Sequence, residues 1–128
     1  MSLRSPLGEA LGRGAAKAGV HHWWVQRLTA IALVPLASWF AVSLLAMPAH
    51  GYATVAAWVG EPWTAVLLLL FVVTAAWHSQ LGVRVVIEDY VHGCGMRTVL
   101  LALSTYLHVL AAAAGVFAVL RVALGGAA

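Results

Sequence analysis

Three long apolar stretches, each free of Asp, Glu, Lys and Arg, constrain this chain more than any other feature. They cover about residues 28–47, 63–83 and 98–120. A helix needs about 20 mostly apolar residues to cross a hydrocarbon core about 30 Å thick, and each stretch reaches that length. Lipid offers the backbone no hydrogen-bonding partner, so only helices and closed barrels span a membrane. The sequence therefore predicts an all-α membrane protein with three transmembrane helices.

The composition excludes an ordinary soluble domain. Hydrophobic residues make up 63% of the 128 residues and charged residues only 9%, against about 45–50% and 25% in soluble proteins. Residues 1–18 are rich in Gly, Ala and Arg, and we expect a flexible segment there. Residues 19–128 then form a single three-span membrane anchor domain. Because three helices do not close a bundle, we expect them to form part of a multi-subunit helical bundle.

The distribution of Lys and Arg predicts the orientation in the membrane. Six of the seven lie before the first span or between the second and third, at positions Arg4, Arg13, Lys17, Arg27, Arg84 and Arg97. Only Arg121 lies on the other side. Segments rich in Lys and Arg stay in the cytoplasm, so a multi-pass protein of the bacterial inner membrane is predicted, with the N-terminus cytoplasmic and the C-terminus outside. Orientation in lipid explains the net charge of +3, and no nucleic-acid partner is expected.

Two histidines, His78 and His108, fall inside predicted spans. The sequence has no glycine-rich phosphate loop, dinucleotide fingerprint or Ser/His/Asp pattern, so no catalytic residue is expected in this chain alone. Any chemistry then depends on histidines, a few carboxylates and a bound cofactor. Ionisable residues at membrane depth are costly and indicate a functional site.

His78, Gly82 and Asp89 share one stripe of the predicted second helix. At about 100° per residue, Gly82 falls on the His78 face, and Asp89 returns to within about 20° of it, about 16 Å along the axis. Imidazole is a normal axial ligand of haem iron, and a glycine one turn away leaves room for a flat macrocycle. Tyr90 carries a phenolic O–H that can donate to a carbonyl oxygen, such as that of a quinone head group.

On spacing alone, other interpretations of these residues remain open. A histidine inside a span can also make a hydrogen bond between helices, which we expect for His108. Asp89 and Tyr90 are also consistent with a polar pair and an interfacial tyrosine at a helix end. Arg27 is also typical of a positive-inside anchor. Three further histidines are predicted to lie outside the spans, in solvent or at subunit contacts: His22, His50 and His92.

The pattern His78-x3-Gly82-x6-Asp89-Tyr90 resembles the signature of the smaller haem-b membrane anchor of succinate dehydrogenase, a small cytochrome b-type chain. The start of the first span, from Gly19-Val-His21 to Arg27-Leu-Thr29-Ala30, is similar to the beginning of that family's first helix. The three-span layout and the chain length agree as well. The resemblance therefore covers roughly residues 19–124.

The resemblance implies a role for each matching residue. His78 matches the axial ligand of a haem b iron, whose second ligand comes from a histidine of the larger anchor, and Gly82 belongs to the same haem-binding motif. Arg27 and His21 match residues that approach the haem propionates. Tyr90 matches the tyrosine that hydrogen-bonds the quinone, with Asp89 beside it holding a basic residue of a neighbouring subunit. Ubiquinone is favoured over menaquinone.

The resemblance also implies the assembly. It is a succinate:quinone oxidoreductase in which a flavoprotein subunit oxidises succinate and an iron–sulfur subunit passes electrons to the membrane. There a larger cytochrome b anchor subunit joins this chain, and quinone is reduced. Two alternatives stay open: the anchor of a fumarate reductase, which runs the reaction in reverse, and a haem-free structural anchor in which His78 only packs.

Overall fold

The computed structural model describes residues 16–125, with side chains from residue 20 onward. Within that range it consists of four helices without strands: α2 (Ala16–Ala46), α3 (Tyr52–Gly60), α4 (Pro62–Tyr90) and α5 (Cys94–Ala123). α2 (from Val20), α4 and α5 are long and apolar enough to cross a membrane, which confirms the predicted fold class. The flexible segment predicted at 1–18 lies outside the described residues up to position 15, and residues 16–18 are helical.

The long helices continue beyond the apolar stretches from which they were predicted. α4 runs to Tyr90 rather than to residue 83, and its last turns are stabilised by an i,i+4 ion pair in which Arg84 Nε donates to Glu88 Oε1 at 2.9 Å. Residues at that spacing share one helix face. Hydropathy therefore marks where the hydrocarbon stops, whereas the backbone hydrogen bonds continue into the polar interface.

A short helix, α3, occupies the segment between the first two predicted spans, where no helix was predicted from the sequence. It begins after Gly51, and Glu61 both ends it and precedes Pro62, the first residue of α4. The Trp58 ring of α3 stacks on Trp39 of α2 with centroids 5.8 Å apart. A one-sided apolar contact of this kind holds a helix too short to be stable alone, and hydropathy could not identify it.

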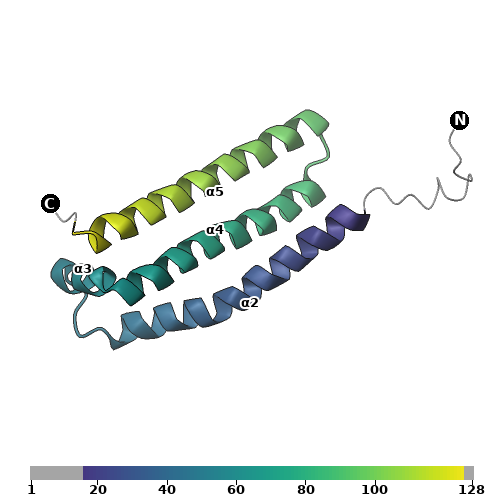
Figure 1. Cartoon of the computed structure of the whole chain (residues 1–128). Helices are drawn as coiled ribbons and strands as arrows, with labels where there is room; N and C mark the ends of the chain where they lie inside the picture. The colour runs from purple at the N-terminus through teal and green to yellow at the C-terminus, as the bar shows by residue number, and fades with distance from the viewer. Residues whose placement is uncertain (1–15, 126–128) are drawn as a thin grey trace, which may run out of the picture.

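The three spans form an open layer with α4 in the middle. Among the described residues, α4 packs on both α2 and α5, and Figure 1 shows α2 and α5 on its opposite sides. The small apolar core lies toward α3, where Ala65, Leu68 and Val119 are buried. Only 6% to 11% of the most apolar window of each span is buried. Most of the helix surface is therefore left for lipid or for other chains.

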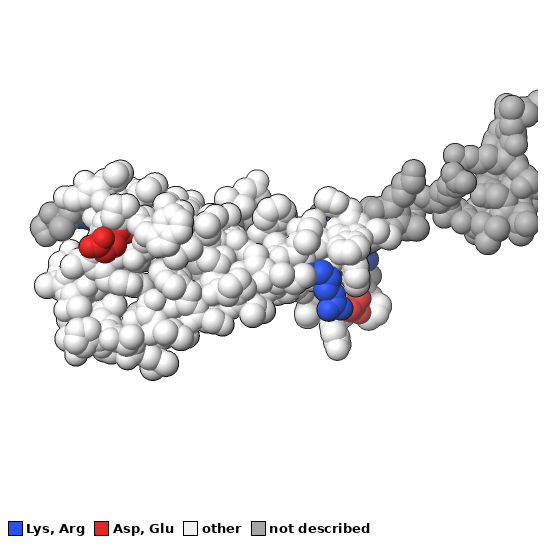
Figure 2. Space-filling view, turned by 60° about the horizontal axis from the view of Figure 1, so that its bottom comes forward, with Lys and Arg blue, Asp and Glu red and all other residues white. Residues whose placement is uncertain are grey.

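Charged side chains lie at the two ends of the layer. Figure 2 shows blue and red atoms only near the ends of the visible face, with an uncharged middle. The end where α2 begins, termed here the basic end because its arginines outnumber its carboxylates, carries Arg27, Arg84 and Arg97 together with Glu88 and Asp89. The opposite end, termed the α3 end, carries Glu61 and Arg121. This arrangement fits a layer that crosses a membrane end to end.

Gly115 lies at a close approach of α5 to α4. A Cβ built on Gly115 would lie 2.8 Å from Val72 Cγ1, which is shorter than carbon atoms tolerate. Valine is β-branched and stiff in a helix, so its methyl group cannot easily move away. A small residue at this position lets the two backbones approach, as is common between membrane helices.

We predict that Gly115→Ala destabilises the packing of α4 on α5, by about 1–3 kcal/mol as for other overpacked sites. Gly95→Ala is the matched control, because nothing lies within 4 Å of a Cβ there and alanine favours a helix by about 0.5–1 kcal/mol over glycine. The measurement is thermal unfolding of the detergent-purified complex. The double variant Gly115→Ala, Val72→Ala should recover stability. Equal effects of the two single glycine variants would contradict this packing.

Candidate functional site

Three consecutive polar residues of α4 connect it to both neighbouring spans. His78 Nδ1 lies 2.9 Å from the Thr29 hydroxyl of α2. The next two residues, Ser79 and Gln80, bond to side chains of α5. Successive helix residues point about 100° apart, so this short segment can reach both neighbours. It fixes the position of α4 along both helices at one level of the membrane.

The Thr29 hydroxyl determines which nitrogen of His78 carries the proton. Thr29 Oγ1 lies 2.8 Å from the carbonyl oxygen of Val25 and 3.1 Å from that of Gln26. Carbonyl oxygens only accept, and a hydroxyl has one proton, so Thr29 donates to its own helix. Its oxygen must then accept from His78, which places the imidazole proton on Nδ1. In the neutral ring, Nε2 is left with a lone pair.

Nε2 of His78 has no hydrogen-bond partner among residues 20–125. His78 is half-buried and Thr29 is only 8% exposed. The ring is thus held from α2 through one nitrogen while the other remains available. An available imidazole nitrogen with a fixed tautomer is the arrangement found in metal-ligating histidines, whose second nitrogen donates to a nearby acceptor.

His108 differs from His78 because both of its ring nitrogens are used. Nδ1 lies 2.8 Å from the Ser104 carbonyl oxygen and therefore donates to it. Nε2 then accepts from the Ser79 hydroxyl, 3.1 Å away on α4. The predicted hydrogen bond between helices is confirmed. His108 connects two helices and has no lone pair left for a metal.

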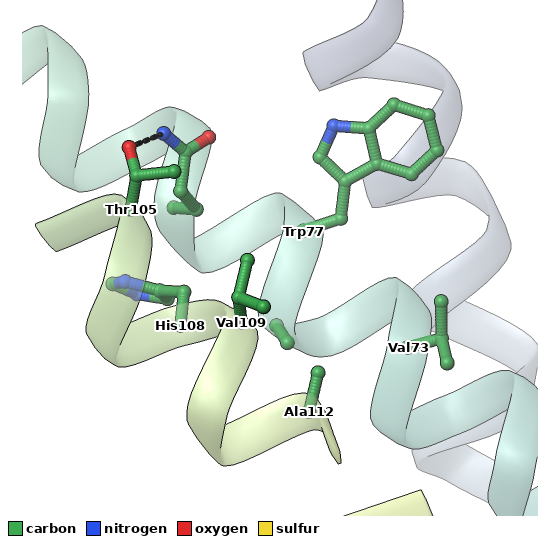
Figure 3. Close-up of a pocket in the computed structure, with 8 residues that line it drawn as sticks. Val73, Trp77, Thr105, His108, Val109 and Ala112 are labelled. Atoms are coloured by element: carbon green, nitrogen blue, oxygen red, sulfur yellow. Dashed lines mark hydrogen bonds between the residues drawn. The ribbon is translucent and has the colours of Figure 1, made fainter. Parts of the chain in front are cut away.

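A groove of about 320 Å³ lies between α4 and α5 beside His108 (Figure 3). Figure 3 shows Trp77 and Val73 on one wall and Val109 and Ala112 on the other. Most of its lining is apolar, and two of its polar side chains are engaged: Gln80 Nε2 donates to Thr105 Oγ1 at 3.3 Å, and the His108 imidazole is bonded at both nitrogens. The groove therefore suits apolar groups and offers a polar ligand little to bind.

The face of α2 that meets α4 near His78 is polar. Two of its buried atoms, His22 Nε2 and Gln26 Oε1, have no hydrogen-bond partner in the described part of the chain. Gly82 of α4 faces this stretch, since a Cβ there would lie 3.7 Å from Gln26 Nε2. That distance is an ordinary contact, so packing within this chain does not require a glycine. His22 was predicted to lie outside the spans, in solvent or at a subunit contact; its placement outside the first span was wrong, because it lies within α2 and its Nε2 is buried.

His21 and Arg27, the other two candidates on α2, do not take part in the hydrogen bonds around His78. Both are exposed, and the Arg27 guanidinium lies over the Trp23 ring, 5.4 Å from its centroid. Neither bonds to His78 in the described residues. The sequence selected His21 and Arg27 but missed Thr29, the residue that bonds His78. Thr29 lies within Arg27-Leu-Thr29-Ala30, so a signal was present, but the sequence did not show which of the polar residues in this part of α2 meets the neighbouring helix.

Asp89 and Tyr90 lie at the last residues of α4, at the basic end. Both are exposed, Tyr90 by 78%. Neither forms a hydrogen bond or an ion pair within residues 20–125. Because α4 is one unbroken helix from Pro62 to Tyr90, His78, Gly82 and Asp89 do share a stripe, as the spacing predicts. The phenol and the carboxylate are therefore available to groups outside this chain.

The side chains of the described residues do not form a metal site by themselves. No group of three or more His, Cys, Asp or Glu residues among those described comes close enough to hold an ion. A metal at His78 would need to bring other ligands with it. An iron porphyrin does so, since the macrocycle supplies four nitrogens and leaves only axial positions to the protein.

The chain is similar in sequence to known membrane subunits. The family described as succinate dehydrogenase/fumarate reductase transmembrane subunit matches residues 1–120. The chain is 31% identical over 125 residues to the succinate dehydrogenase hydrophobic membrane anchor subunit of Paracoccus denitrificans, covering 98% of this chain and 96% of that one. It is 35% identical over 99 residues to the same subunit of Rickettsia bellii, covering 77% and 79%. The chain therefore belongs to the succinate dehydrogenase/fumarate reductase transmembrane subunit family, in which it is similar to the hydrophobic membrane anchors of succinate dehydrogenase.

Proposed function

We propose that this chain binds haem b and quinone as a membrane anchor of succinate dehydrogenase, and helps electrons pass from an iron–sulfur subunit to quinone. One observation carries the proposal. At membrane depth, the His78 imidazole is held through Nδ1 by Thr29 and keeps Nε2 without a partner among the described residues. A polar atom left unpaired away from water costs about 1–3 kcal/mol, and iron ligation would remove that cost.

The residues around His78 fit a haem. Gly82 lies one turn from His78, and packing within this chain does not require a glycine there. The buried His22 Nε2 and Gln26 Oε1 have no hydrogen-bond partner among the described residues. The haem would supply one-electron transfer. The second axial ligand is proposed to be a histidine of a larger cytochrome b anchor. Exposed Arg27 and His21 can reach groups outside this chain, and a guanidinium binds carboxylates such as haem propionates in a fork.

The quinone is proposed to bind at Tyr90. Its phenol is exposed at the interface, beside the Asp89 carboxylate, and can donate to one of the two carbonyl oxygens of the head group. Asp89 would act by positioning a basic residue of a neighbouring subunit. His78 and Asp89 lie on the same stripe of the helix, about 16 Å apart along its axis. The proposed haem and quinone would therefore bind near enough to each other for electron transfer.

The basic end is proposed to face the cytoplasm, where the flavoprotein and iron–sulfur subunits would dock. Its described arginines are Arg27, Arg84 and Arg97, whereas the α3 end has only Arg121 among the described residues. Arginine and lysine are retained on the cytoplasmic side. The N-terminus would then be cytoplasmic and the C-terminus outside.

Labelling with a membrane-impermeant maleimide tests the orientation. Cys94 is exposed at the basic end and should react only after the cells are permeabilised. A Glu61→Cys, Cys94→Ser variant places the single thiol at the exposed α3 end and should react in intact cells. The reverse pattern would refute the proposed topology.

His78→Ala should remove or strongly alter the b-type absorption band, because it deletes the available Nε2. His108→Ala is the matched control: it removes another histidine at membrane depth, but one whose nitrogens are both bonded. Its complex should keep the band. The measurement is a reduced-minus-oxidised spectrum of each purified complex, together with the haem potential. If the spectrum and the haem potential of His78→Ala are both those of the wild type, His78 is not a ligand. A wild-type complex that contains no haem would favour the haem-free anchor.

Tyr90→Phe should leave assembly, haem content and succinate oxidation with a soluble dye intact, while quinone reduction falls about 10- to 100-fold because a misplaced head group reacts slowly. Tyr52→Phe is the control. Tyr52 is 71% exposed and lies at the other end of the layer, so its hydroxyl should not matter. Steady-state rates with quinone and with dye separate the two steps. Normal quinone reduction by Tyr90→Phe would show that the tyrosine is only an interfacial anchor.

A further inference from the structure

We infer that Thr29 is a positioning residue for the haem ligand: its hydroxyl fixes the tautomer and orientation of His78 and thereby lowers the reduction potential of the haem. The inference rests on the proposed haem site and assigns a role to a residue of α2 that does not itself touch the iron. Thr29 lies on a different helix from His78, and a buried hydrogen bond of 2.9 Å joins them.

His78, Thr29 and Val25 form a chain of hydrogen bonds in which each group donates to the next. His78 Nδ1–H donates to Thr29 Oγ1, and the Thr29 O–H donates to the Val25 carbonyl oxygen at 2.8 Å. Hydrogen bonds in such a chain polarise one another, so the bond to the carbonyl makes the hydroxyl a better acceptor for the imidazole proton. Because the threonine proton is committed to its own helix, the opposite arrangement, with the proton on His78 Nε2, is disfavoured.

The direction of these hydrogen bonds affects how strongly His78 Nε2 would donate electrons to iron. An acceptor on Nδ1–H raises the basicity of the imidazole at Nε2. A more basic ligand stabilises ferric iron more than ferrous iron, so the bond to Thr29 should lower the reduction potential. The bond also disfavours the neutral tautomer that carries its proton on Nε2, in which the ligating lone pair would be lost. Loss of the hydroxyl should therefore raise the potential and weaken haem retention.

Thr105 provides a matched comparison within the same chain. Like Thr29, it donates to the carbonyl oxygen four residues earlier, Leu101 at 2.9 Å, and accepts from a side chain of α4, Gln80 at 3.3 Å. Replacing either threonine with valine keeps the β-branched shape and removes one hydroxyl that joins α4 to a neighbouring span. Only the Thr29 hydroxyl acts on a proposed ligand.

The experiment is a redox titration of the haem in the purified complex, with the ferric electron paramagnetic resonance spectrum recorded alongside. Thr29→Val should shift the ferric/ferrous balance several-fold toward ferrous, a tenfold shift being about 59 mV for one electron, and should change the g values. Thr29→Ser keeps the hydroxyl and should restore the wild-type potential. Thr105→Val should leave it unchanged. If Thr29→Val does not assemble, Thr29→Ala takes its place, since it removes the hydroxyl without adding bulk.

Two failures can be told apart. A wild-type complex without haem, or an unchanged haem in His78→Ala, would overturn the proposed site itself. A haem that depends on His78 but has the same potential and g values in the hydroxyl-free Thr29 variant would overturn only the role of Thr29. A shift of equal size in Thr105→Val would also overturn it, because the effect would then reflect helix packing and not the ligand.

Discussion

Hydrogen bonding without water decides how these helices fit together. Inside a bilayer, polar groups must find partners within the protein, and the apolar surfaces of the helices gain little by packing on one another instead of on lipid. Apolar contacts do not fix how one helix is positioned against another. The side chains of His78, Ser79 and Gln80 do so, because each forms a hydrogen bond with a different residue of α2 or α5. The close approach at Gly115 then brings α5 against α4. The open layer follows from these contacts together with the small apolar core toward α3.

The two histidines at this level show how the same side chain can serve packing or binding. His108 donates through Nδ1 to its own helix and accepts through Nε2 from α4, so its hydrogen-bonding capacity is filled. His78 donates through Nδ1 to α2, and no described residue occupies Nε2. Composition and depth do not distinguish them. The positions of Thr29 and Ser79 do, because they determine which ring nitrogens have no hydrogen-bond partner.

The spans were predictable because their signal is local. A stretch without charge and long enough to cross lipid has few alternatives, and the three helices were found with ends short by several residues. α3 was missed because its stability comes from the stacking of Trp58 on Trp39 of another helix. The site was predicted in part: the stripe from His78 to Asp89 follows from helix geometry alone. Which residues of α2 face His78 did not follow, because the polar residues at the start of α2 lie on several of its sides, with His21 and Arg27 exposed and His22 and Gln26 carrying buried atoms. His21 and His22 differ by one position, yet of these two only His22 turns a nitrogen inward.

The thin layer of helices and the unpaired Nε2 of His78 both indicate that the proposed site is completed by another chain. With at most 11% of a span's apolar window buried, the described residues enclose no site by themselves, and the proposed haem at His78 would need another chain to cover its other side. A family of membrane anchors for a multi-subunit enzyme meets that requirement, since partner subunits come with the assembly. The free energy released when His78 Nε2, His22 Nε2 and Gln26 Oε1 gain partners would then appear as assembly energy and not as stability of the isolated chain. Binding of the proposed haem and association with the second anchor would be thermodynamically linked, because each supplies contacts that the other needs.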